Sequence, residues 1–286
     1  MKSNRFILLL AYIFISVLFF SYANGQKIVK ILAIGNSFSQ DAAESYVDDL
    51  AKADGVQLII ANMYIGGCSL ERHWKNAEGD SAAYSYRKIV NGDTTIVAKQ
   101  RLSAAIQDEN WDYITFQQAS PYSGIIDSYF PYLTNLLSYT KQLTTNRKVK
   151  FAFHQTWAYA ANSKHTGFKS YNNDQQQMYQ AIMNAVEIAV KKAGINIVIP
   201  SGTAIQNGRT SFIGDNFCRD GYHLSLGLGR FTAACTWYET LLKRNVIKNS
   251  FIPTGVTPEE ARVAKNAAHC AVKQPYKVAE MKKFSE

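Results

Sequence analysis

Short apolar segments rich in β-branched residues alternate along this chain with longer segments of helical spacing, and this alternation limits the folds open to it. Residues 28–34 are nearly all apolar, as in a strand buried on both faces of a parallel sheet. Strands are predicted at residues 28–34, 56–63, 111–116, 148–153 and 195–199. Helices are predicted at residues 41–54, 95–107, 129–144, 173–193, 226–243 and 257–271. The order favours an α/β fold in which a parallel sheet carries helices on both faces.

The amino terminus has the pattern of a secretory signal. A basic end precedes an almost uncharged apolar run at residues 6–22, and the small residues Ala23-Asn24-Gly25 follow. The run is short for a membrane span and ends in a cleavage-like sequence, so residues 1–25 are predicted to be removed. An uncleaved N-terminal anchor is the alternative. Residues 26–286 are then expected to form one exported domain, periplasmic or secreted, with no stable membrane insertion.

The basic charge of the chain does not point to a nucleic-acid partner. The formal net charge of +9 falls to +7 once Lys2 and Arg5 leave with the signal. The remaining basic residues are spread along the chain, and no basic run is interleaved with aromatic residues as in a nucleic-acid groove. A solvated basic surface is therefore expected.

Polar or glycine-rich segments follow four of the predicted strands. These segments are Gly35-Asn36-Ser37, Gly66-Gly67-Cys68-Ser69, Gln117-Gln118-Ala119-Ser120 and His154-Gln155-Thr156-Trp157. In parallel sheets, ligands bind beyond the carboxyl ends of the strands. The four segments are therefore expected to line one mouth, over which a late loop at residues 219–225 folds back.

The late loop and the first strand end together offer the groups of a serine hydrolase. Asp220 lies three residues before His223, and Ser37 follows a buried strand. One ring nitrogen of the histidine would take the serine proton, and the aspartate would hold the second ring nitrogen by a hydrogen bond. Ser37 is therefore the predicted nucleophile, and Ser39 is the rival candidate.

An oxyanion hole needs hydrogen-bond donors at the same mouth. The backbone N–H of Ser37 is one candidate, and that of Gly67 is a second, since a glycine lets the backbone approach closely. A side-chain amide of Gln118 or of Gln117 is the candidate for a third donor.

The set of motifs resembles the SGNH (GDSL-type) hydrolases. Gly35-Asn36-Ser37, Gly67 and the pair Asp220/His223 match its first, second and last sequence blocks, over nearly all of the mature chain. The resemblance implies a three-layer α/β/α sandwich with a five-stranded parallel sheet, of flavodoxin-like type. It also implies an esterase, lipase, thioesterase or carbohydrate deacetylase that needs no metal and no cofactor.

Two positions depart from the family pattern. Asn36 stands where the pattern has Asp, and Gln117-Gln118 replace the Gly-x-Asn of the third block. Glutamine at that block is similar to branches that act on acetylated sialate or xylan. The resemblance therefore implies an acylated carbohydrate, or another small ester, as the substrate.

Other polar and aromatic residues are candidates for the wall of the mouth. His154, Trp157 and Asn36 are predicted to line it, although His154 could equally satisfy a strand-end carbonyl. Tyr64, Trp74 and Trp157 could form a platform for a sugar ring, or could pack in the core. His73 and His165 are expected in exposed loops.

Two further functions remain open for the same scaffold. A non-catalytic glycan-binding module would use the aromatic mouth alone, and an acyltransferase would use the same residues with a sugar in place of water. The sequence does not define the oligomeric state, and no cluster of residues has metal-ligand spacing. Cys68 and Cys218 could form a disulfide if the predicted mouth brings them together.

Overall fold

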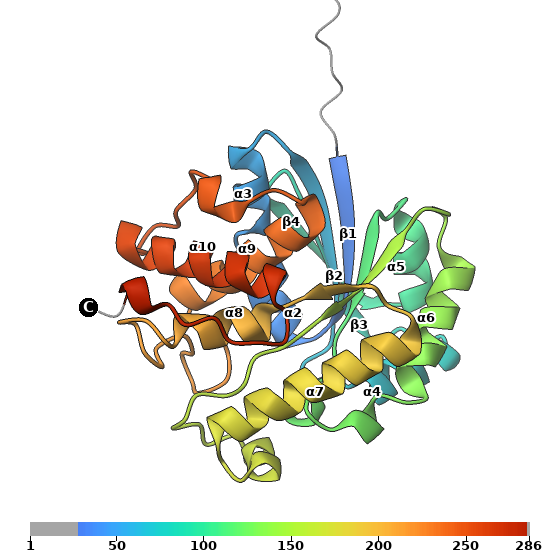
Figure 1. Ribbon diagram of the computed structural model, residues 1–286. Helices are drawn as coiled ribbons and strands as arrows, with labels where there is room; N and C mark the ends of the chain where they lie inside the picture. The colour runs from blue at the N-terminus through green and yellow to red at the C-terminus, as the bar shows by residue number, and fades with distance from the viewer. Residues whose placement is uncertain (1–27, 285–286) are drawn as a thin grey trace, which may run out of the picture.

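The computed structural model describes residues 28–284. Its centre is a seven-stranded sheet in the order β4-β3-β2-β1-β5-β6-β7 (Figure 1). The strands are β1 (Ile28–Gly35), β2 (Gln57–Tyr64), β3 (Tyr84–Val90), β4 (Asp93–Gln100), β5 (Tyr113–Phe116), β6 (Lys150–His154) and β7 (Ile197–Ile199). The predicted signal peptide lies outside the described residues.

Five of the seven strands are parallel, and they are the five predicted from the sequence. β1 pairs in parallel with β2 on one side and with β5 on the other, and β6 and β7 continue the sheet in the same direction. The middle strands are buried on both faces, which explains their continuous apolar runs. The predicted α/β fold with a parallel core is confirmed.

An antiparallel hairpin extends this core and corrects one predicted helix. The structure places β4 at Asp93–Gln100 and a short helix, α5, at Leu102–Asp108, where a helix was predicted at residues 95–107. Asn91 and Gly92 both have positive φ and form the tight turn between β3 and β4. An Asn-Gly pair between β-branched runs is a hairpin signal, and it outweighs the helical spacing.

Two helical layers cover the sheet (Figure 1). The first holds α2 (Ser37–Ala43), α3 (Val47–Ala53), α8 (Ser201–Gly208), α9 (Leu228–Leu242) and α10 (Pro258–Lys273). The second holds α4 (Leu70–Glu78), α5, α6 (Tyr132–Leu143) and α7 (Gln175–Ala193). The three-layer α/β/α arrangement expected from the family resemblance is therefore present.

The predicted helix at residues 41–54 is divided in the structure. α2 begins at Ser37 itself, and α3 follows after a break at residues 44–46. The predicted start of α10 is confirmed, because Thr257 and Glu260 form a reciprocal capping box. Within residues 28–284, no helix combines the length and the apolar character that crossing a bilayer requires.

Candidate active site

Ser37 lies at the turn from β1 into α2, where it is the first helical residue. Asn36 caps this helix, because its Oδ1 accepts the backbone N–H of Phe38 at 2.9 Å. A Cβ at Gly35 would lie 2.4 Å from Oγ of Ser39, so only glycine permits this tight turn. The first N–H groups of a helix lack intrahelical partners, and the N–H of Ser37 is one of them.

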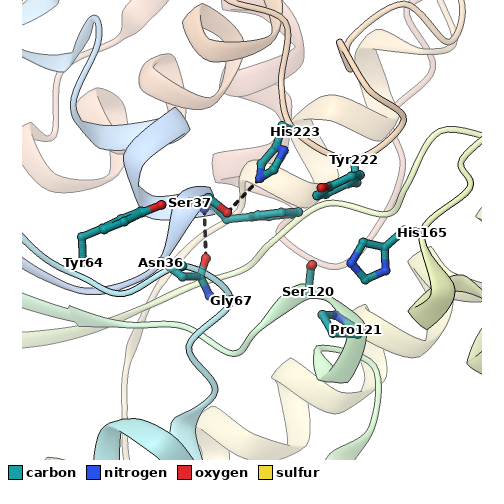
Figure 2. A pocket seen from close by; sticks show the side chains of 11 residues that line it. Asn36, Ser37, Tyr64, Gly67, Ser120, Pro121, His165, Tyr222 and His223 are labelled. Atoms are coloured by element: carbon teal, nitrogen blue, oxygen red, sulfur yellow. Dashed lines mark hydrogen bonds between the residues drawn. The ribbon is translucent and has the colours of Figure 1, made fainter. Parts of the chain in front are cut away.

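Ser37, His223 and Asp220 form a continuous hydrogen-bonded chain. Nε2 of His223 lies 2.9 Å from Oγ of Ser37 (Figure 2). Nδ1 of His223 lies 2.7 Å from Oδ2 of Asp220. An ionised carboxylate only accepts hydrogen bonds, so Nδ1 carries the ring hydrogen and Nε2 is left to accept from the serine. The structure thus brings Ser37 into contact with His223, which lies 186 positions later in the sequence.

Asp220 is held as an anion by the loop that carries His223. Partial burial acts against its charge, but hydrogen bonds from the ring of His223 and from the backbone N–H groups of His223 and Tyr222 outweigh it. The pKa of Asp220 is therefore below its ordinary value. The carboxylate stays ionised at neutral pH and orients the imidazole.

A buried carboxylate on α2 fixes this loop beside the serine. Asp41, one helical turn after Ser37, is 1% exposed and accepts the backbone N–H of Leu224 at 2.9 Å. It also accepts hydrogen bonds from the guanidinium groups of Arg219 and Arg230. Asp41 therefore ties both flanks of the His223 loop to the helix that carries Ser37.

A pocket of about 290 Å³ opens beside the serine. Its lining residues are Asn36, Ser37, Phe38, Tyr64, Gly66, Gly67, Ser120, Pro121, His165, Tyr222 and His223 (Figure 2). The lining contains no lysine, arginine, aspartate or glutamate. Its size and its lining of aromatic and uncharged polar groups suit a small neutral ligand.

Gly67 brings a second backbone donor to this pocket. Its φ of 62° is in the left-handed region that favours glycine, and its backbone N–H has no hydrogen-bond partner within the described residues. Nδ2 of Asn36 donates to the carbonyl of Cys68 at 3.0 Å and so joins the Gly67 loop to the serine turn. The Ser37 and Gly67 backbones are held in one arrangement by this contact.

The two glutamines considered as a third donor do not line the pocket. Gln118 accepts from the backbone N–H groups of Leu70 and Ala119, and its amide donates to Ser128. Nε2 of Gln117 donates to Oδ1 of Asn36 at 2.7 Å. Both amides are buried and engaged, so Gln117 and Gln118 connect loops and are not positioned as oxyanion donors.

His154 and Trp157 also lie behind the pocket wall and do not line it. His154 is fully buried between Oε1 of Gln117 and Oγ of Ser201, and burial lowers its pKa to about 3. Trp157 is buried, stacks on Phe38 with centroids 4.2 Å apart, and donates to the carbonyl of Tyr222. These two residues support the serine turn and the His223 loop from below.

Several lining residues were not found from the sequence. His165 was expected in an exposed loop but faces the pocket, and His73 is instead buried against Tyr84. Tyr222 also lines the pocket, and its place inside the Asp-x-x-His segment could have indicated this. Tyr64 lines the pocket, as the predicted aromatic platform required. Trp74 instead packs against Tyr139.

The buried histidines predict a measurable acid sensitivity. Burial lowers the pKa of both His73 and His154 to about 3, whereas an unfolded histidine binds a proton below about 6.5. The unfolded state therefore binds more protons as pH falls from 6.5 towards 3, and stability is lost in that window. Each histidine is expected to contribute about 1.4 kcal/mol per pH unit to the slope of unfolding free energy.

Urea denaturation of the wild type and of His154→Gln between pH 6.5 and 4.5 measures this contribution. The variant lacks one titrating group, so its stability should fall less steeply with acid. Equal slopes for the two proteins would contradict the neutral, buried state of His154.

The cysteines and acidic residues provide no further site chemistry. All four cysteines are free thiols, so the hypothesised bond between Cys68 and Cys218 is not formed. Burial raises the pKa of Cys68 to about 12, and its thiol is therefore not a nucleophile at neutral pH. Across residues 28–284, no group of three or more His, Cys, Asp or Glu side chains is arranged to hold a metal ion.

Comparison with known structures defines the class of fold. A proposed SGNH hydrolase from Slackia heliotrinireducens superposes with a TM-score of 0.52 at 19% identity, over 75% of this chain and 100% of its own. An acetylxylan esterase from Geobacillus stearothermophilus gives a TM-score of 0.47 at 13% identity, over 79% and 97% of the two chains. This chain therefore shares its α/β fold with the Slackia structure, which is described as an SGNH hydrolase.

The chain belongs to the DUF4886 family, a domain of unknown function whose model matches residues 30–271. A DUF4886 family protein from Bacteroides uniformis, solved as a crystal structure, is 50% identical. It superposes with a TM-score of 0.89 over 91% of this chain and 100% of its own. A search of curated proteins finds no match.

Proposed function

We propose that the protein is a metal-independent serine esterase of the SGNH type, which removes O-acetyl or other small acyl groups from carbohydrates. The observation that carries the proposal is the hydrogen-bonded chain from Ser37 through His223 to Asp220 at the edge of a pocket. A serine hydroxyl bonded to an imidazole, which is itself oriented by a carboxylate, is the arrangement that activates a serine for attack.

The reaction proceeds in two halves at the same groups. Oγ of Ser37 attacks the acyl carbon as Nε2 of His223 takes its proton, and the carbonyl oxygen becomes an oxyanion. The backbone N–H groups of Ser37 and Gly67 donate to that oxyanion, each worth about 3 kcal/mol in the transition state. His223 then protonates the departing alcohol, and a water molecule deprotonated by His223 releases the acyl group from Ser37.

The pocket supports the choice of substrate. Its volume of about 290 Å³ leaves room for a short acyl group, and its lining lacks charged Lys, Arg, Asp and Glu side chains. Aromatic and hydroxyl groups from Tyr64, Tyr222 and Ser120 suit a neutral hydroxylated compound. The signal-like amino terminus supports export, so we propose that the substrates are acetylated glycans in the periplasm or medium.

Acetate release from neutral acetylated sugars tests the proposal. The purified protein is expected to free acetate from singly acetylated methyl glycosides and from p-nitrophenyl acetate, without added metal and in the presence of a chelator. Binding of these esters without any acetate release would instead favour a glycan-binding module.

A further inference from the structure

His165 occupies the pocket wall beyond the catalytic base. It precedes the short helix η3 (Thr166–Tyr171), and its Nδ1 accepts the backbone N–H of Gly167 at 3.0 Å. Its ring packs edge-on against Tyr222, with centroids 4.8 Å apart, and lies tilted against the ring of Tyr159 at 4.9 Å. Figure 2 shows the ring facing the pocket on the side opposite Tyr64. These contacts fix the ring in one orientation.

The hydrogen bond to Gly167 determines which ring nitrogen carries the hydrogen. A backbone N–H can only donate, so Nδ1 of His165 is unprotonated and the neutral ring has its hydrogen on Nε2. Burial and the nearby His223 lower the pKa of His165 against the opposing effect of Asp220, which keeps the ring neutral. Nε2 has no hydrogen-bond partner within residues 28–284. The wall therefore presents one fixed, unused N–H donor.

This donor lies on the side of the pocket where the alcohol part of an ester would bind. In the proposed reaction His223 hands its proton to the departing alcohol, so that alcohol lies against His223. The ring of Tyr222 lies 4.2 Å from that of His223, and the ring of His165 follows it along the same wall. The hydroxyl of Ser120, bonded to Tyr159, adds a second polar group there.

We infer that Nε2–H of His165 donates a hydrogen bond to an oxygen of the leaving alcohol and so selects neutral polyhydroxylated alcohols, such as sugars, over plain ones. The inference rests on the proposed esterase function and adds the residue that recognises the alcohol. The absence of Lys and Arg from the lining leaves no counter-ion for an acidic sugar, so the alcohol is uncharged.

Two substitutions separate the donor from the capping role of the same side chain. In His165→Asn, the amide oxygen takes the place of Nδ1 and keeps the bond to Gly167, while the Nε2 donor is lost. In His165→Gln, the longer amide places an N–H donor where Nε2 lies, while the cap is lost. Thermal unfolding of both variants shows whether either loses its fold.

A pair of acetate esters that differ only in the alcohol provides the readout. His165→Asn is expected to lower kcat/KM for a singly acetylated methyl glycoside about 3- to 10-fold, and to leave p-nitrophenyl acetate within about twofold of the wild type. His165→Gln is expected to retain most of the activity on the glycoside.

Three outcomes would overturn the inference: no loss on the glycoside, an equal loss on both esters, or a glutamine variant as impaired as the asparagine one. An equal loss would mean that His165 acts on the catalytic triad or the acetyl group. Failure of the wild type to hydrolyse either ester would contradict the proposed function itself, and is distinct from these three results.

Discussion

Ser37→Ala is expected to lower kcat for ester hydrolysis by at least about 10⁴-fold, with no loss of folding. The hydroxyl is the group that forms the acyl-enzyme in the proposed reaction, and its one hydrogen bond within residues 28–284 is to His223. Alanine is accommodated readily at the first position of α2, because Asn36 provides the helix cap. Steady-state hydrolysis of p-nitrophenyl acetate and thermal unfolding measure the two quantities.

The rival serine is the matched control. Ser39 is buried, and its Oγ donates within a network that includes the carbonyl of Asn36 and Oδ1 of Asn62. Ser39→Ala should cost about 1 kcal/mol of stability and retain most of the activity. The double variant Ser37→Ala/His223→Ala should be no slower than Ser37→Ala, because the two groups act as a unit. More than about 1% residual activity in Ser37→Ala would reject Ser37 as the nucleophile.

Asp41→Asn is expected to combine a loss of about 3 kcal/mol in stability with a 10- to 100-fold fall in kcat. Asparagine keeps an oxygen for the N–H of Leu224 but removes the charge that balances Arg219 and Arg230. Asp41 is buried, and removing its charge leaves two partly buried guanidinium groups without their counter-ion. The loop that carries His223 then loses its anchor, and a displacement of about 1 Å at a catalytic group lowers the rate steeply.

A buried carboxylate that does not line the pocket, Glu239, separates the effect on stability from the effect on kcat. Glu239 accepts from Nδ1 of His269 at 2.6 Å and from the backbone N–H of Val246, and so joins α9 to α10 and to the segment before it. Glu239→Gln should lower the unfolding temperature as Asp41→Asn does, but leave kcat unchanged below that temperature. If Asp41→Asn lowers the stability but leaves kcat unchanged, as expected for Glu239→Gln, then Asp41 does not position His223.

The parts of the fold that follow from local chemistry could be predicted from the sequence. Strands such as β1 and β5 are apolar on both faces because helices cover both sides, and this produces an unbroken apolar run. The capping box that begins α10 is equally local. The hairpin of β3 and β4 was missed because β4 is an exposed edge strand without a buried face.

The proximity of Ser37, His223 and Asp220 could be predicted because each role in a serine hydrolase requires a specific residue type at a strand end or in the late loop. The positions of the buried glutamine amides could not be predicted. Gln118 and Gln117 have the same chemistry, and only the packing of α4 and the serine turn decides which loop each amide bonds. His165 could not be assigned either, since the backbone of the loop at residues 155–174 determines where its ring points.

Covalent labelling with a fluorophosphonate tests the central claim most directly. The reagent phosphonylates a serine only where a base and an oxyanion hole activate it. Peptide mapping by mass spectrometry after treatment is expected to find one adduct, on Ser37, and none on Ser39 or in the Ser37→Ala protein. An absence of adduct on Ser37 in the folded wild type, or an adduct on another serine, would contradict the assignment.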